Sequence, residues 1–170
     1  MNKDSKIQRI VWTGLFTALV AVGTMIRLPI PMANGYVNAG DAMVIVSAFL
    51  LTPFWGAFAA GVGAAITDAM YGYFIYVPAT LVIKACMALA AGAILRTFKD
   101  KKPKTGAVLG SVCAAVILVG GYFAYECLIY GFAGALADVI PNTIQGVFGA
   151  AAGTVLFYAL SRIPYVREHF

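Results

Sequence analysis

Charged residues are scarce in this sequence, and their scarcity argues against a water-soluble protein. Asp, Glu, Lys and Arg make up 11% of the 170 residues, whereas 62% are hydrophobic and the mean hydropathy is +0.88. Soluble domains carry about 25% charged residues, so lipid rather than water is expected to surround most of this chain. No stretch is polar enough for a separate soluble domain. We therefore expect residues 1–170 to form one integral-membrane domain.

Groups that perform covalent or metal chemistry are nearly absent. The single histidine, His169, lies close to the C-terminus, and Cys86, Cys113 and Cys127 lie in apolar stretches without metal-ligand or redox spacing. The sequence has neither a Gly-x-x-x-x-Gly-Lys-Ser/Thr phosphate-binding loop nor a Ser-His-Asp arrangement. We expect no catalytic residue, no metal and no cofactor. The protein is predicted not to be an enzyme, and ATP hydrolysis would have to come from a partner.

Six apolar segments run along the chain. Their ranges are 7–28, 37–51, 54–71, 78–98, 105–132 and 139–163. Pro, Gly and Lys residues separate them, and the last break is expected at 134–138. A spanning helix needs about 20 residues, so the sequence predicts an all-α bundle of six transmembrane helices. The second segment is short, and it either tilts or forms a re-entrant hairpin with the third.

Basic residues are distributed in a way that orients the bundle. Ten of the twelve flank the predicted helices: Lys3, Lys6, Arg9, Arg96, Lys99, Lys101, Lys102, Lys104, Arg162 and Arg167. Six crossings place all ten on one face, which the positive-inside rule assigns to the cytoplasm together with both termini. The first segment lacks a small-x-small cleavage site, so it is expected to remain as a span. The same bias explains the net charge of +5, and no nucleic acid partner is expected.

Polar side chains enter the predicted membrane segments in one layer near their outer ends. They are Asp41, Asp68, Lys84, Glu126, Asn142 and Gln145. Ionisable groups at such depth are costly unless they are paired or line a wet cavity, and the cytoplasmic halves of the same segments are almost purely apolar. The pattern predicts a pocket that is open to the outside. The alternative is a structural cluster, for example a Lys84 pair with Glu126 or Asp68.

Tyrosines gather at the same outer ends. Seven of the nine lie there: Tyr36, Tyr71, Tyr73, Tyr76, Tyr122, Tyr125 and Tyr130. An interfacial aromatic belt accounts for part of this excess, and a site that stacks a flat heteroaromatic ring accounts for the rest. Tyr71, Tyr76 and Tyr122 are the candidate contacts. The loop at 29–40 comes directly before Asp41. It is either a lid over the pocket or an ordinary connector.

Small residues recur at four-residue spacing in the first segment, at Gly14, Ala18 and Val22. Such a row lets another helix approach closely. Similar rows occur at 56–64 and 146–154, so most of these small-residue rows are expected to serve packing inside the protein. For the row in the first segment, contact with an external partner is the alternative.

Five runs of the sequence carry a family resemblance. They are VNAGDA at 37–42, LTPFWGA at 51–57, GVGAAITD at 61–68, YVPATLVIK at 76–84 and PNTIQG at 141–146. Together they resemble the substrate-binding S components of energy-coupling factor (ECF) transporters. The resemblance extends over nearly the whole chain.

This resemblance implies a multi-pass subunit in the cytoplasmic membrane of a prokaryote that captures a small water-soluble vitamin or precursor. Pyridoxine-like or hydroxymethylpyrimidine-like compounds fit best. It implies docking through the first helix on a membrane scaffold (T) subunit, with two ATPases that drive release by toppling of the S component. The site residues implied by position are Asn38, Asp41, Asp68, Lys84, Asn142 and Gln145. The assignment of Glu126 and the tyrosines to the site is based only on their depth in the predicted membrane segments.

Two other classes of protein remain open. A membrane-embedded enzyme acting on lipid or prenyl substrates would usually carry a metal-binding Asp-rich repeat, which is not present in this sequence. A structural or assembly subunit would have a polar layer that is internally paired and insensitive to any ligand.

Overall fold

The computed structural model describes residues 3–29, 36–98, 100 and 102–169, and this part of the chain is almost entirely helical. The elements are α1 (Lys3–Met25), β1 (Arg27–Pro29), β2 (Tyr36–Asn38), α2 (Gly40–Leu50), α3 (Pro53–Met70), α4 (Val77–Phe98), α5 (Pro103–Leu160) and α6 (Pro164–His169). Strands β1 and β2 form a small antiparallel ribbon that pairs Arg27 with Asn38. The predicted helical fold is confirmed. Much of the predicted lid, 30–35, lies outside the described residues.

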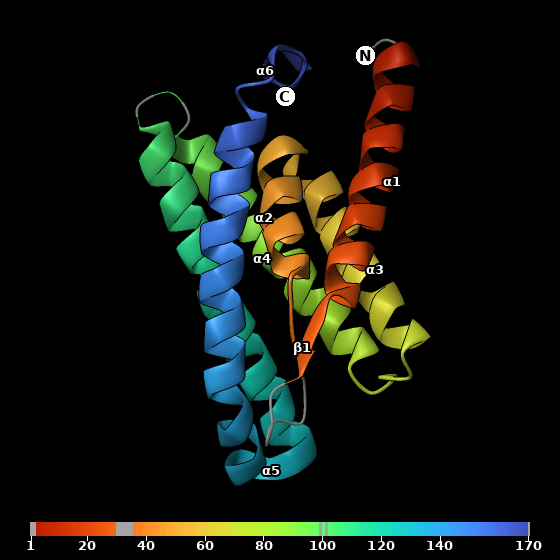
Figure 1. Cartoon of the computed structure of the whole chain (residues 1–170), viewed down its shortest axis with the longest axis vertical. Coiled ribbons are helices and arrows are strands. Elements are labelled where there is room, and N and C mark those ends of the chain that lie inside the picture. Colours follow the sequence, from red (N-terminus) through yellow and green to blue (C-terminus); the bar gives the residue numbers. More distant parts are fainter. Residues whose placement is uncertain (1–2, 30–35, 99, 101, 170) are drawn as a thin grey trace.

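The long helix α5 is folded into two antiparallel arms. Gly131 is its one non-helical residue, with φ 74° and ψ 173°, and the chain reverses direction there, so that the second arm runs back beside the first (Figure 1). Glycine tolerates this positive φ because it has no Cβ. The break expected at 134–138 is wrong, because those residues are helical and the one positive φ within α5 falls at Gly131.

Within the described part of the chain, three helices are long and apolar enough to cross a membrane: residues 6–25, α4, and α5 with its two arms. Helix α2 has only 11 residues, about 16 Å at 1.5 Å per residue, which is shorter than the hydrocarbon layer of about 30 Å. The first residues of the predicted second segment, 37 and 38, belong to β2 instead. Figure 1 shows α2 starting inside the bundle, at the end of this ribbon.

The two chain ends lie at the same end of the molecule. Figure 1 shows the N-terminus, the C-terminus and the start of α5 there, whereas the turn within α5 lies at the opposite end. The basic clusters around 102–104 and at Arg162 therefore share the end with the termini, and the predicted polar layer lies toward the α5 turn.

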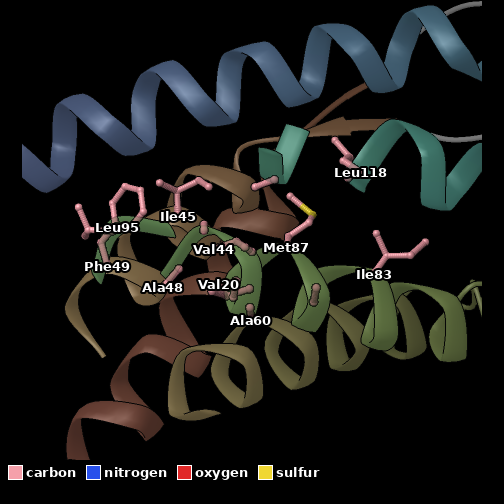
Figure 2. Packing of buried hydrophobic residues seen from close by; sticks show 14 of the residues in the cluster. Val20, Val44, Ile45, Ala48, Phe49, Ala60, Ile83, Met87, Leu95 and Leu118 are labelled. Carbon is pink, nitrogen blue, oxygen red and sulfur yellow. The ribbon is translucent and has the colours of Figure 1, made fainter. Parts of the chain in front are cut away.

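Helix α2 is the centre of the hydrophobic core. All of its residues except Met43 are buried, as expected for a helix that is apolar on every side. Val44, Ile45 and Phe49 pack with Val20 of α1, with Met87 of α4 and with Leu118 of α5 (Figure 2). The neighbouring helices thus enclose α2 and hold its first turn in a defined place.

Glycine allows the helices to approach closely at several contacts. A Cβ built on Gly63 of α3 would lie 2.5 Å from the carbonyl oxygen of Thr17 in α1, and one on Gly92 of α4 would lie 2.7 Å from that of Ala48 in α2. The Thr67 hydroxyl of α3 donates a hydrogen bond of 3.1 Å to the Ala21 carbonyl oxygen. One face of α1 is thereby packed against α3.

The small-residue row of α1 lies outside this contact. Gly14, Ala18 and Val22 are exposed, and a Cβ on Gly14 would meet nothing within 4 Å. By contrast, Ala60 and Ala64 of α3 are fully buried. The internal-packing interpretation therefore fits the row in α3, while the row in α1 faces outward.

We predict that Gly63→Ala lowers the melting temperature in detergent, because the added methyl group would overlap the Thr17 carbonyl and the Val20 side chain. The cost expected for overpacking is about 1–3 kcal/mol. Gly14→Ala is the matched control, and it should leave the melting temperature unchanged or slightly raised, since alanine favours helix. Equal melting temperatures for the Gly63 variant and the unmodified chain would contradict the close contact.

Candidate functional site

A cavity opens between α1, β2, α3, α4 and both arms of α5. Its lining combines carboxylates, one lysine, amides, hydroxyls and aromatic rings: Thr24, Asn38, Asp68, Tyr73, Tyr76, Thr80, Lys84, Tyr122, Glu126, Asp138, Pro141, Asn142 and Gln145. It offers about 50 Å³ to the centres of water-sized molecules and about 560 Å³ of empty space when its opening is included. Each helical contributor comes from the half of its helix that is nearer to the ribbon and the α5 turn.

A buried ion pair lies directly beneath this cavity. The Lys84 ammonium contacts Asp41 Oδ1, and both side chains are only 2% exposed. Gln145 donates from Nε2 to Asp41 Oδ2 at 2.7 Å, so both carboxylate oxygens are engaged. The position of Asp41 in the first turn of α2 also suits a carboxylate, because the helix dipole is positive there. The alternative of a structural cluster has, as its example, a pair of Lys84 with Glu126 or Asp68, and the partner in the structure is instead Asp41, which the enclosed start of α2 brings to the ammonium group.

The ribbon is joined to the second arm of α5 through the same network. The backbone N–H of Asn38 donates to Gln145 Oε1 at 3.0 Å, and the Asn38 Oδ1 accepts the N–H of Gly40 at 2.9 Å. Gln145 thus binds Asp41 with one end of its amide and Asn38 with the other. Helices α2, α4 and α5 and strand β2 all meet at this network.

Tyrosine rings form one wall of the cavity. The ring of Tyr76 lies 6.4 Å from that of Tyr122 and 6.0 Å from that of Tyr125. The Tyr122 hydroxyl hydrogen-bonds Thr80 at 2.9 Å, and the Lys84 ammonium lies 5.6 Å from the centre of the Tyr122 ring. These contacts keep the rings in fixed orientations, and a flat ligand could stack on them.

An acidic corner completes the lining and consists of Glu126, Asp138 and Tyr76. The three side chains are 3%, 1% and 8% exposed. Glu126 Oε2 and the Tyr76 hydroxyl are buried and have no hydrogen bond of normal geometry among the described residues, although the two side chains lie close enough to interact. Burial raises the pKa of the Tyr76 phenol above its ordinary value, which keeps the hydroxyl protonated.

The structure brings together eight of the ten residues predicted to bind substrate. They are Asn38, Asp68, Tyr76, Lys84, Tyr122, Glu126, Asn142 and Gln145. Asp41 lies beneath the cavity, where it neutralises Lys84. Tyr71 is 51% exposed and lies outside the lining, with the Arg27 guanidinium 3.6 Å from its ring centre.

Sequence reasoning missed five residues of the lining: Thr24, Tyr73, Thr80, Asp138 and Pro141. The break predicted at 134–138 puts Asp138 in an interhelical loop, yet Asp138 precedes Asn142 by four residues and Gln145 by seven. This spacing places the three on one face of a helix. The spacing was therefore a signal that could have identified Asp138.

Comparisons with known proteins agree on one class. The family model for the ECF-type riboflavin transporter S component matches residues 4–162. An uncharacterized protein of Pyrococcus woesei is 37% identical over 84% of this chain and 95% of its own length. The thiamine precursor transporter HmpT of Lactococcus lactis subsp. cremoris (strain MG1363) is 26% identical over 94% of this chain and 91% of its own.

A solved structure of the S component of a bacterial ECF transporter has the same fold. It superimposes with a TM-score of 0.70 over 92% of this chain and 97% of that chain, at 19% sequence identity.

We predict that Lys84→Met destabilises the protein by about 3–5 kcal/mol, because Asp41 is left as an uncompensated buried charge. The double variant Lys84→Met with Asp41→Asn should recover much of this loss, since no charge is then unpaired and Gln145 retains an acceptor. Thermal unfolding of the purified variants in detergent measures both effects. If the double variant is no more stable than Lys84→Met alone, the loss of stability does not come from an unpaired Asp41 charge.

Proposed function

Because the chain belongs to the family of ECF-type riboflavin transporter S components, we propose that it binds its substrate in the cavity beneath the tyrosine wall. S components belong to transporters and are not enzymes. One observation carries the proposal: charged and amide side chains from β2, α3, α4 and α5 meet around a cavity inside a bundle that is otherwise mostly apolar. Intramembrane ionisable groups of this kind usually mark a binding site or a transport path.

The proposed substrate is a small water-soluble vitamin or vitamin precursor with a flat heteroaromatic ring. Tyr76 and Tyr122 supply ring faces, while Asn142, Glu126 and Asp68 supply polar groups for its edge. The enclosed part of the cavity is small, which favours one ring over a larger fused system. A hydroxymethylpyrimidine-like compound is our first candidate, in keeping with the likeness to a thiamine precursor transporter. A pyridoxine-like compound is the second.

We place the chain in the cytoplasmic membrane of a prokaryote, with six crossings and both termini in the cytoplasm. The crossings would be α1, α3, α4, the two arms of α5, and the short helix α2 together with the strand β2 that leads into it. Two features support this orientation. The start of α5 and the connection between α5 and α6 lie at the end that carries the termini (Figure 1), and these segments contain Lys102, Lys104 and Arg162. The cavity residues come from the other end, where an extracellular substrate arrives.

Docking on a scaffold T subunit, with two ATPases as the energy source, completes the proposed cycle. The outward row of α1, Gly14, Ala18 and Val22, is the proposed contact. It is exposed and free of bulky side chains at two of its three positions, so a partner helix can approach closely.

A purely structural role is favoured by one part of the site only. The network of Lys84, Asp41, Gln145 and Asn38 satisfies its own members. Glu126 and Tyr76, by contrast, keep polar atoms that no described residue satisfies. A compound that stabilises the protein on binding would favour the substrate-binding role over the purely structural one.

We predict that one compound in a panel of vitamins and precursors raises the melting temperature of the detergent-purified chain by several degrees. A ligand at 100 times its Kd stabilises the folded state by about 2.7 kcal/mol. Asn142→Ala should reduce the shift, whereas Tyr71→Phe, outside the cavity, should retain it. Absence of any shift across a broad panel would favour the structural role.

Cysteine labelling tests the proposed topology. In a background with the native cysteines replaced by alanine, Ala133→Cys should react with a membrane-impermeant maleimide on intact cells. Thr105→Cys, at the basic end, should react only after permeabilisation. The reverse pattern would contradict the orientation.

A further inference from the structure

Two polar atoms distinguish the acidic corner from the rest of the cavity. Glu126 Oε2 and the Tyr76 hydroxyl are buried without a hydrogen-bond partner among the described residues, and their side chains are 97% and 92% removed from solvent. Leaving such a group unsatisfied costs about 1–3 kcal/mol. Both side chains line the cavity, so a molecule bound there can satisfy them.

The charges around the cavity favour a ligand that offers hydrogen-bond donors. Lys84 is the one cation among the described lining residues, and Asp41 already neutralises it from below. The lining also includes the carboxylates of Asp68, Glu126 and Asp138, and Glu126 has a buried oxygen that no described residue satisfies. An ionised carboxylate accepts hydrogen bonds and donates none, so this corner suits an N–H group or a cationic ring.

Tyr76 provides a donor of fixed position beside the carboxylate. Its ring packs against Tyr122 and Tyr125, and Tyr125 is itself held by a hydrogen bond from its hydroxyl to the Ile75 carbonyl. The hydroxyl of Tyr76 can therefore donate to a ligand acceptor while Glu126 accepts from a neighbouring ligand donor. A donor and an acceptor side by side match the edge of an aromatic amidine, in which an exocyclic amine adjoins a ring nitrogen.

We propose that Glu126 and Tyr76 form the specificity subsite of the cavity and select an amino-substituted heteroaromatic ring over its oxo analogue. The carboxylate of Glu126 accepts from the exocyclic amine, and the Tyr76 hydroxyl donates to the adjacent ring nitrogen. This inference rests on the proposed function. In the oxo analogue a carbonyl oxygen replaces the amine and faces the carboxylate, so an acceptor meets an acceptor and neither is satisfied.

Calorimetric titration of the full chain in detergent tests the subsite with two ligands that differ only along this edge of the ring. The ligands are hydroxymethylpyrimidine with its exocyclic amine and the analogue in which a carbonyl replaces the amine. We expect the amino compound to bind about 10- to 100-fold more tightly, the range that one unsatisfied buried pair accounts for. Glu126→Gln should narrow this ratio, because an amide can both donate and accept. Tyr71→Phe, outside the cavity, should leave the ratio unchanged.

The outcomes separate this inference from the proposed function. Equal binding of the two pyrimidines, or tighter binding of the oxo analogue, overturns the subsite while leaving the cavity as the binding site. If another vitamin binds and neither pyrimidine does, the subsite is likewise overturned and the cavity remains the binding site. If no compound of the broad panel binds, the proposed function itself fails. Should Glu126→Gln fail to fold, the affinity ratio measured on the unmodified chain still decides, and Tyr76→Phe supplies the second variant with the same expected narrowing.

Discussion

The structure depends on one buried ion pair, between Lys84 and Asp41. A lysine ammonium inside an apolar bundle is strongly unfavourable unless an opposite charge meets it directly. Helix α2 provides that charge in its first turn, and the surrounding helices bury α2 on every side. Gln145 donates a hydrogen bond to the second carboxylate oxygen of Asp41 and accepts one from the backbone N–H of Asn38 in the ribbon. Four elements are therefore located relative to one another by a single charged group.

This pair also divides the molecule into two halves with different physical chemistry. On the side of the termini, aliphatic and small side chains pack around α2, and glycines such as Gly92 let backbones touch. On the side of the α5 turn, carboxylates, amides and tyrosines surround a cavity. The ion pair lies between these two halves, because Lys84 lines the cavity and its partner Asp41 begins the buried helix α2.

Much of the site could be predicted because a polar residue within an apolar membrane segment is costly unless it is paired or lines a cavity. Lys84, Glu126 and Asn142 were identified from depth or resemblance alone, and each lines the cavity. Asp138 was missed because a loop was assigned around it, although the chain remains helical there. Tyr71 and Tyr73 are two residues apart, yet only Tyr73 lines the cavity; the turn between them, where Gly72 has a positive φ, is not specified by the distribution of tyrosines.

The sequence by itself determined the membrane character, the apolar segments and the identity of the polar layer, because these follow from local composition and from the length needed to cross lipid. The tertiary structure alone decided that Lys84 pairs with Asp41, that α5 reverses at Gly131, and which tyrosines face the cavity. Asp41 and Gln145 are 104 positions apart in the chain. Their contact depends on how helices rotate and how closely their glycines allow them to pack, which no local pattern specifies.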